Sequence, residues 1–174
     1  SFSFDVFTEN LLRGLMSGGK LVVCPQETLL SPRDLYELLR AEQVELAEFV
    51  PALLRPLMQY LEETRQTLDF MRVVISGADA LYADEYKQLR QLCSAEARVF
   101  NSYGLTEATI DNFVFESSVA ETNFNGPAPL GRPFAGVRVY ILDPQLQPVP
   151  AGVAGELYVG GECLARGYLQ RPDL

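Results

Sequence analysis

Histidine is absent from the 174 residues, and lysine occurs only at Lys20 and Lys87. Without histidine, the sequence contains no Ser-His-Asp or Cys-His catalytic group and lacks a ligand that most zinc sites use. The three cysteines, Cys24, Cys93 and Cys163, lie far apart and form no CxxC pair. They suit no disulfide framework and favour a reducing compartment, so we expect a cytoplasmic protein.

Long apolar runs are also absent. No segment approaches the ~18 apolar residues of a membrane span, and no signal-peptide pattern precedes the fold. The net charge is −9 and no basic stripe occurs, which argues against nucleic-acid binding. The composition, 48% hydrophobic and 21% charged, is that of a globular protein. The sequence opens and stops abruptly, so we expect it to be cut from a longer polypeptide.

The first two-thirds of the sequence alternates strand-like and helix-period segments. Strands are predicted at 20–24, 44–50, 72–76 and 99–100, with helices before and between them. Strands recurring every ~25 residues predict right-handed βαβ units, and hence an α/β fold with a flavodoxin-like parallel sheet flanked by helices. Ligands bind beyond the carboxyl ends of such strands. We therefore expect the segments at those ends, 49–50, 76–79 and 101–107, to converge on one cleft.

The pattern changes after about Ser118. Residues 121–133 are rich in Asn, Gly and Pro, and 137–142 and 156–159 read as strands of an antiparallel hairpin. We place a boundary near Ser118–Asn125. Residues 1–120 form the parallel α/β subdomain, and residues 121–174 form the start of a β-rich subdomain of distorted-barrel type.

The most informative segment is Asn101–Glu107, Asn-Ser-Tyr-Gly-Leu-Thr-Glu. It follows an apolar strand and combines an amide, a phenol, a flexible glycine, a hydroxyl and a carboxylate. Those groups can stack on a base, contact phosphate and hold a divalent cation. A second glycine-rich segment, 155–169, lies far downstream.

Four elements in order resemble the amino-acid-activating adenylation domains of nonribosomal peptide synthetases. Phe4-Asp5-Val6-Phe7 is similar to their FDxS element, and Ser76–Leu81 to their GGEAL element. Asn101–Glu107 is similar to NxYGPTE, with Leu105 in place of the usual proline. Leu130–Pro133 and Gly155–Leu169 are similar to the GELxxxGxxxARGYL region. The resemblance covers nearly the whole chain.

The resemblance implies activation of an amino acid with ATP and Mg²⁺, followed by transfer to a phosphopantetheine thiol on a carrier domain. The remaining adenylation subdomains and the carrier and condensation domains of the parent synthetase would be its partners. Thr106 and Glu107 would be catalytic, with Thr106 on phosphate and Glu107 on the metal. Nucleotide-binding residues would be Gly77, Ala78, Asp79, Asn101, Ser102, Tyr103, Gly104 and Thr106, with Tyr103 stacking on adenine and Asn101 at its edge. The amino-acid pocket would comprise Asp5, Val6, Glu9, Phe49, Val74, Ser76, Ser102, Ile110 and Asp111. The glycine-rich segment would be mainly structural.

Three of these assignments have simpler alternatives. Asp5 would pair with the substrate α-ammonium, but an Asp before a helix is usually an N-cap. Thr106 and Glu107 could form an exposed turn. Gly77 could serve a tight turn between strand and helix, which is compatible with the functional role.

Glu9 carries the expectation about the substrate side chain. It falls one helical turn beyond Asp5 on the same face. A carboxylate in a mostly apolar pocket is costly unless it is paired, and a cationic substrate would supply the partner. We therefore expect arginine, lysine or ornithine. Glu9 could instead bond a neutral polar substrate or point to solvent, and Asp111 supports the cationic substrate more weakly.

Other interpretations stay open. An acyl- or aryl-CoA ligase would have no α-ammonium and no reason to bury Asp5. A non-catalytic flavodoxin-like binding module would need an anion-binding first loop, which is not visible. A fragment without any ligand is a third possibility. The family's phosphate loop, ribose-binding aspartate and catalytic lysine have no counterpart here, so we expect the isolated chain to be catalytically incompetent.

Overall fold

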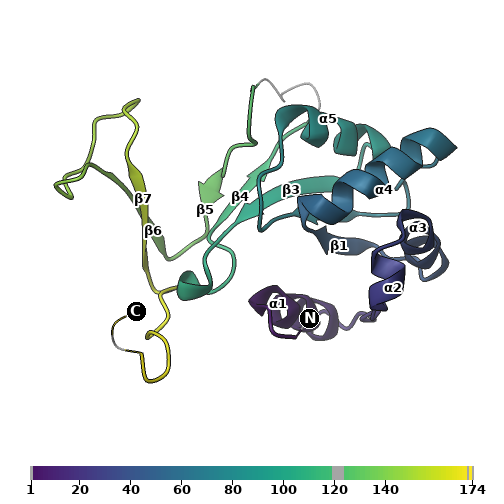
Figure 1. Cartoon of the computed structure of the whole chain (residues 1–174), viewed down its shortest axis with the longest axis horizontal. Helices are drawn as coiled ribbons and strands as arrows, with labels where there is room; N and C mark the ends of the chain where they lie inside the picture. Colours follow the sequence, from purple (N-terminus) through teal and green to yellow (C-terminus); the bar gives the residue numbers. More distant parts are fainter. Residues whose placement is uncertain (1, 119–123, 172, 174) are drawn as a thin grey trace.

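Five strands form the central sheet of the protein, in the order β1-β2-β3-β4-β5 (Figure 1). A computed structural model describes residues 2–118, 124–171 and 173. The strands are β1 (Leu46–Phe49), β2 (Val73–Ser76), β3 (Arg98–Tyr103), β4 (Phe113–Glu116) and β5 (Arg132–Pro133). The first three are parallel, whereas β4 and β5 run antiparallel to their neighbours. The predicted α/β sheet is confirmed, with two antiparallel strands added to it.

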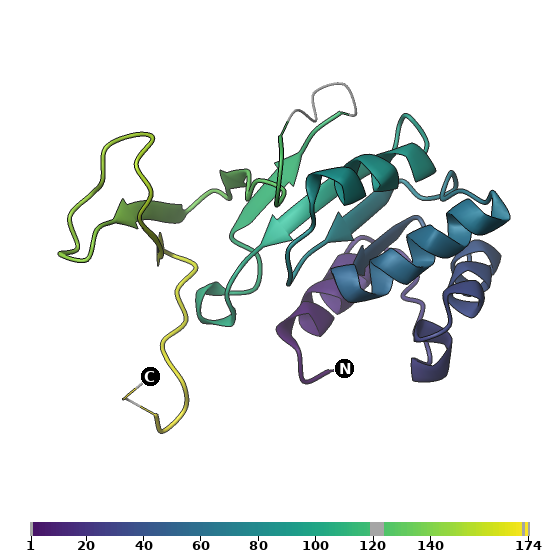
Figure 2. The same ribbon diagram turned by 45° about the horizontal axis from the view of Figure 1, so that its top comes forward.

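The helices are α1 (Asp5–Met16), α2 (Gln26–Leu29), α3 (Pro32–Ala41), α4 (Pro51–Thr64) and α5 (Ala83–Leu92), followed by the 3-10 turn η1 (Thr106–Ala108). Helices α4 and α5 cover one face of the sheet and α1 lies on the other side (Figure 2). Helix α3 begins at a capped terminus, with Ser31 accepting a hydrogen bond from the Asp34 N–H and Pro32 in the first turn. No described helix has the length and apolarity needed to cross a membrane.

The main core lies between the sheet and helices α3, α4 and α5. Residues spaced by three and four along α4 are almost fully buried: Leu54, Leu57, Met58 and Leu61. They pack with Val74 of β2 and Val99 of β3. This spacing places one helical face on the sheet, as the sequence pattern predicts.

Strand pairing aligns the carboxyl ends of the parallel strands. Phe49 lies opposite Ser76, and Ser76 lies opposite Asn101. The three expected cleft segments therefore start from adjacent positions at one edge of the sheet. This confirms the placement that the βαβ pattern predicts.

The predicted strand at 20–24 is wrong. The segment is an extended connector without strand pairing, and Val23 is 80% exposed. Leu21 instead packs near Gly14 of α1. A short apolar run is compatible with several conformations, and only a neighbouring strand makes it part of a sheet.

Helix α1 is confirmed, and Gly18 ends it with a left-handed backbone (φ +73°). Three of its apolar residues are largely exposed in the described chain: Leu12, Leu15 and Met16 are 50%, 57% and 80% exposed. The helix is instead connected to the sheet through polar side chains, which are described below.

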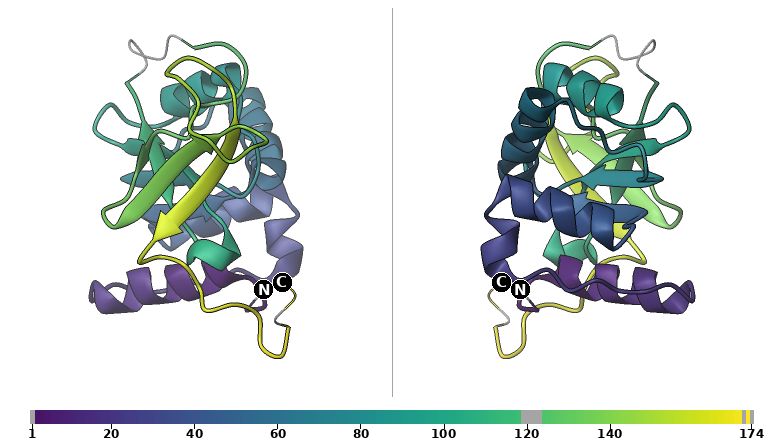
Figure 3. Two further views of the ribbon diagram at one scale, coloured as in Figure 1. Left: turned by 90° about the vertical axis from the view of Figure 1, so that its left-hand side faces the viewer. Right: turned by 90° about the vertical axis from the view of Figure 1, so that its right-hand side faces the viewer.

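The predicted hairpin is confirmed as β6 (Val137–Leu142) and β7 (Glu156–Gly161), which pair antiparallel. It projects beyond the β5 side of the main sheet, and Figure 3 shows it from that side. Part of the proposed boundary, residues 119–123, lies outside the described residues. Strand β5, which follows it, pairs with β4 of the main sheet. The division into 1–120 and 121–174 stays a prediction.

Tyr86 of α5 anchors the helix to the sheet, and its removal gives a direct test of the core. Its hydroxyl lies 2.8 Å from the Val99 carbonyl oxygen and accepts a hydrogen bond from the Ser117 N–H at 2.9 Å. Because Tyr86→Phe leaves these buried groups without a partner, we expect it to lower the free energy of unfolding by about 1–3 kcal/mol. Urea unfolding measures this loss.

Tyr60→Phe is the matched control, because Tyr60 is half-buried and no hydrogen bond to its hydroxyl occurs among the described residues. It should change the free energy of unfolding by less than about 0.5 kcal/mol. Equal effects of the two substitutions would contradict the anchoring role of Tyr86.

Candidate active site

Asp5 joins the start of α1 to the loop after β3. It is the first residue of the helix, and Phe4 takes the N-cap position that the sequence alternative gave to Asp5. One carboxylate oxygen accepts a hydrogen bond from the Val6 N–H at 2.9 Å, and the other accepts one from the Thr106 hydroxyl at 2.6 Å. Two residues predicted to contact the amino acid and the phosphate therefore touch each other.

Three carboxylates from three separate parts of the chain form a cluster beside this link. Oxygens of Glu9, Glu48 and Asp111 all lie within 4.8 Å of one another. Arg13, one turn after Glu9 on α1, forms an ion pair with Glu9 and a longer one, 3.4 Å, with Glu48. Asn10 also donates to Glu48, at 3.3 Å. The cluster thus carries more acidic than basic groups.

Burial makes these charges costly. The Glu48 side chain is only 6% exposed, and burial raises its pKa, as does the nearby Asp111, although Arg13 and Asn10 oppose the rise. Burial likewise raises the pKa of Asp111, with Asp5 adding to the rise and Ser102 and Arg13 opposing it. Both carboxylates therefore gain from any added cation or donor.

Two polar atoms at the cluster are buried without a hydrogen-bond partner among the described residues, Glu9 Oε2 and Ser102 Oγ. Ser76 Oγ is also buried and unpartnered, but Ser76 lies opposite Phe49 in the sheet and shares a strand face with Val74, so this predicted pocket residue does not belong to the cluster. The Ser102 hydroxyl lies close enough to Asp111 to lower its pKa, but it makes no hydrogen bond of normal geometry. Gly77 lies at the same place, since a Cβ there would be 2.5 Å from Ser102 Oγ and 3.4 Å from Glu48 Oε1. Buried polar atoms are normally satisfied, so this group suits a ligand with several donors.

The other predicted pocket residues are distributed unevenly. Val6 is half-buried on α1, and Ile110 precedes Asp111 with a left-handed backbone (φ +67°) that is unusual for a β-branched residue. The structure does not bring Phe49 and Val74 into the cluster, because both side chains belong to the main core.

Sequence reasoning missed Glu48 and Arg13. Alternation along β1 could have revealed Glu48, because neighbouring side chains in a strand point to opposite faces and Phe49 is apolar. The spacing of four residues from Glu9 could have revealed Arg13.

A cavity of about 300 Å³ lies on the other side of the β3 loop. Six predicted nucleotide-binding residues line it: Ala78, Asp79, Asn101, Ser102, Tyr103 and Gly104. Gly77 and Thr106 do not. Pro127, Ala128 and Leu130 form the facing wall, which sequence reasoning missed. The Ala128 N–H donates to the Leu81 carbonyl oxygen at 2.7 Å and holds this wall in place.

Two asparagines shape the loop between these spaces. The side-chain nitrogen of Asn101 donates to the Pro129 carbonyl oxygen at 3.0 Å, so it already binds the facing wall. Asn112, fully buried, donates to the Ala108 carbonyl oxygen at 2.6 Å and accepts from the Leu105 N–H at 3.2 Å. Asn112 thereby fixes the turn that carries Thr106 and Glu107. Its position after Asp111 gave no sequence signal.

The glycine-rich C-terminal segment contacts the same turn. The Tyr168 hydroxyl donates to Glu107 at 2.9 Å, and the Ala165 N–H donates to the Glu107 carbonyl oxygen at 2.8 Å. Glu107 is exposed, and its own backbone N–H together with Tyr168 lowers the pKa of its carboxyl. An ionised, accessible carboxylate is the group that a divalent cation requires.

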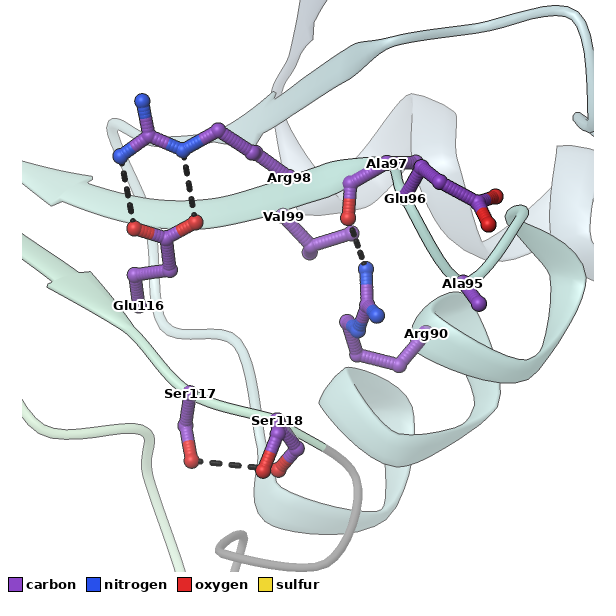
Figure 4. Close-up of a pocket in the computed structure, with 9 residues that line it drawn as sticks. All are labelled: Arg90, Ala95, Glu96, Ala97, Arg98, Val99, Glu116, Ser117 and Ser118. Atoms are coloured by element: carbon purple, nitrogen blue, oxygen red, sulfur yellow. Dashed lines mark hydrogen bonds and ion pairs between the residues drawn. The ribbon is translucent and has the colours of Figure 1, made fainter.

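A second hollow, of about 410 Å³, lies at the opposite end of β3 (Figure 4). Arg98 holds Glu116 through two hydrogen bonds of 2.9 and 2.8 Å, and Arg90 donates to the Ala97 carbonyl oxygen. The Arg98 guanidinium group is therefore engaged by Glu116, whereas Arg90 leaves its Nε buried without a hydrogen-bond partner among the described residues. None of the predicted site residues lines this hollow.

The raised pKa of Glu48 predicts a measurable pH dependence of stability. The folded chain keeps this carboxyl protonated to a higher pH than the unfolded chain, where it titrates near 4.5. The folded state then binds more protons, so stability falls as pH rises through that interval. In Glu48→Gln this contribution is lost, and the free energy of unfolding should decline less between pH 4.5 and 8 than in the unaltered chain.

Urea unfolding across this pH range measures the difference. The control is Glu45→Gln, because Glu45 lies near the start of the same strand with its side chain 64% exposed. The free energy of unfolding of Glu45→Gln should depend on pH in the same way as that of the unaltered chain. An unchanged pH dependence in Glu48→Gln would refute the electrostatic description of the cluster.

A family model described as AMP-binding enzyme matches residues 1–169. The chain is 39% identical over all 174 residues to gramicidin S synthase 2 of Brevibacillus brevis and covers 4% of that protein. It is 40% identical over its full length to tyrocidine synthase 3 of Brevibacillus parabrevis, of which it covers 3%. The chain therefore spans only a small part of the relatives that it matches.

A solved structure gives the same result at the level of the fold. The chain superposes on a four-domain nonribosomal peptide synthetase bound to AMP and glycine with a TM-score of 0.86 and 30% identity, over 99% of this chain and 12% of that one. By these similarities the chain belongs to the family of AMP-binding enzymes, within which it is a segment of the adenylation domains of nonribosomal peptide synthetases.

Proposed function

We propose that this chain is the substrate-selecting segment of an adenylation domain that activates a cationic amino acid, namely arginine, lysine or ornithine. In the parent protein the amino acid reacts with ATP to give an aminoacyl-adenylate. The aminoacyl group then passes to the phosphopantetheine thiol of a carrier domain. The similarity to gramicidin S and tyrocidine synthases supports this general activity.

The observation that carries the cationic substrate is the imbalance of the carboxylate cluster. Glu9, Glu48 and Asp111 share Arg13 as the one basic residue that forms an ion pair within the cluster, among the residues described. A buried carboxylate without a partner costs several kcal/mol, so about two further positive charges or equivalent donors would be favourable. A substrate ammonium or guanidinium group supplies such a charge together with several N–H donors.

The α-ammonium group of the substrate amino acid would bind at Asp5, close to the carboxylate cluster. The Asp5 carboxylate lies at the start of α1 next to Thr106 and would accept hydrogen bonds from the α-ammonium group. A substrate held there would direct its side chain along α1 towards Glu9, one turn further on. The α-carboxylate would then lie on the side of Thr106, where the ATP phosphates are expected.

The 300 Å³ cavity supports adenine binding beside Tyr103. Small residues on one side, Ala78 and Ala80, leave room for a flat ring. The similar four-domain synthetase is bound to AMP, which supports nucleotide binding by this fold. Because Asn101 already binds Pro129, its free contribution to the adenine edge would come from its side-chain oxygen.

The reaction requires positioning more than covalent catalysis. A carboxylate oxygen of the amino acid attacks the α-phosphorus of ATP, a new O–P bond forms, and the bond to pyrophosphate breaks. Asp5 and the cluster would fix the amino acid, and Thr106 would orient the phosphate. Glu107 would hold Mg²⁺, which neutralises phosphate charge when bound.

We also propose that the 174 residues alone do not turn over ATP. Lys20 is paired with Glu42 at 2.6 Å, and Lys87 lies on α5, so neither lysine belongs to the site around Thr106. Adenylate formation by the isolated chain would contradict this part of the proposal.

Amino-acid-dependent ATP–pyrophosphate exchange tests the substrate. We would graft residues 1–118 into a complete adenylation domain and screen the proteinogenic amino acids and ornithine. A cationic amino acid should lead, and Glu9→Gln should lower its kcat/KM by about tenfold or more, equivalent to ~1.4 kcal/mol. The matched control is Glu45→Gln, because Glu45 is exposed and immediately precedes β1, the strand that carries Glu48. This substitution should leave kcat/KM unchanged.

The outcomes separate the two parts of the proposal. Fastest exchange with a neutral amino acid would refute the proposal of a cationic substrate but would leave the proposed adenylation activity intact. A folded graft without any exchange would refute the activity itself.

A further inference from the structure

Arg13 lies between two carboxylates of the cluster, although neither the sequence motifs nor the family resemblance assigns it a role. Its guanidinium group reaches from α1 to two of the three cluster carboxylates, Glu9 and Glu48. The side chain is only 25% exposed. It also lies 3.5 Å from the Asn10 side-chain oxygen, so several partners fix its orientation.

The contacts of Arg13 divide the cluster into two parts. Glu9 Oε1 and Glu48 Oε2 face the guanidinium group. Glu9 Oε2 has no hydrogen-bond partner, and no ion pair to Asp111 occurs among the described residues. The part of the cluster that Arg13 leaves unpaired is therefore next to Asp111 and the buried Ser102 hydroxyl.

We propose that Arg13 is the resident counter-ion of the amino-acid pocket: it pairs Glu9 with Glu48 and leaves Asp111 and the free Glu9 oxygen to the cation of the substrate. This inference rests on the proposed function. With all three carboxylates ionised, Arg13 leaves an excess of two negative charges. The pocket accordingly accepts a substrate cation without releasing Arg13.

The charges around the cluster make this role testable by pH. Asp5, Glu9 and Arg13 face it from α1, Glu48 from β1 and Asp111 from the loop after η1. From β3, the Ser102 hydroxyl faces the cluster beside Asp111. Arg13 is thus the basic group that offsets these acids, and its charge lowers the pKa of both Glu48 and Asp111.

Removal of the charge should make substrate binding depend on pH. In Arg13→Gln the pKa of Glu48 and of Asp111 should rise further, so the ratio of the KM for the cationic amino acid at pH 6.5 to its KM at pH 8.5 should be larger than in the parent domain. In the parent domain and in Arg13→Lys the ratio should stay within about twofold. The kcat should change little, because Arg13 touches no reacting atom.

Two controls separate this role from a structural one. Arg72→Gln removes an exposed arginine whose ion pair with Glu45 is long, 3.9 Å, and should not alter the pH profile. Carboxyl-carbon NMR titration of the parent domain without substrate should show higher pKa values for Glu48 and Asp111 in Arg13→Gln, whichever amino acid is activated.

The possible results have distinct meanings. An equal rise of KM at all pH values, not rescued by Arg13→Lys, would overturn the proposal in favour of a packing role. A lower KM at all pH values would overturn it by showing that Arg13 competes with the substrate. If the parent domain prefers a neutral amino acid, the proposed function fails and the substrate half of this inference fails with it. An NMR titration without a shift would refute the counter-ion itself.

Discussion

The candidate site depends on one electrostatic constraint, namely that three carboxylates share a partly buried space with a single arginine. Isolated charges in such a place are expensive, and proteins normally pair them, coordinate them or let them take up protons. Here Arg13 accounts for only part of the charge, and Glu9 Oε2 remains buried and unpaired. The arrangement is therefore incomplete without a cation. In the function that we propose, this incompleteness connects the fold of the chain to the selection of a substrate.

The fold creates the constraint by bringing three distant segments to one edge of the sheet. Glu48 lies next to last on β1, Ser76 ends β2, and Asp111 follows β3 by way of a turn that Asn112 fixes. Parallel pairing aligns these strand ends, and polar contacts of Asp5 and Arg13 connect α1 to the adjoining loop and strand. The residues that we propose to contact the substrate thus also hold α1 in place. Binding and local stability should be coupled for that reason.

The sequence predicts the strand ends and the adenylation motifs because they are local patterns. Periodicity located α4 and β2, and the motif containing Tyr103 located the cavity beside it. The sequence pattern did not predict which of two neighbours, Glu48 or Phe49, faces the pocket. A shift of one residue along a strand moves a side chain to the opposite face of the sheet. The prediction of a strand at 20–24 failed for a related reason, because strand formation depends on a neighbouring strand that the local sequence does not specify.

The central claim is that the cluster binds the cationic side chain of an amino acid. The most direct test is a crystal structure of the complete parent domain with a non-hydrolysable adenylate analogue of the best exchange substrate. We predict a side-chain nitrogen of the analogue within hydrogen-bond distance of Asp111 and Glu9, its α-ammonium group on Asp5, and Arg13 still paired with Glu48. A neutral side chain in the pocket, or a cationic one directed away from all three carboxylates, would contradict the account.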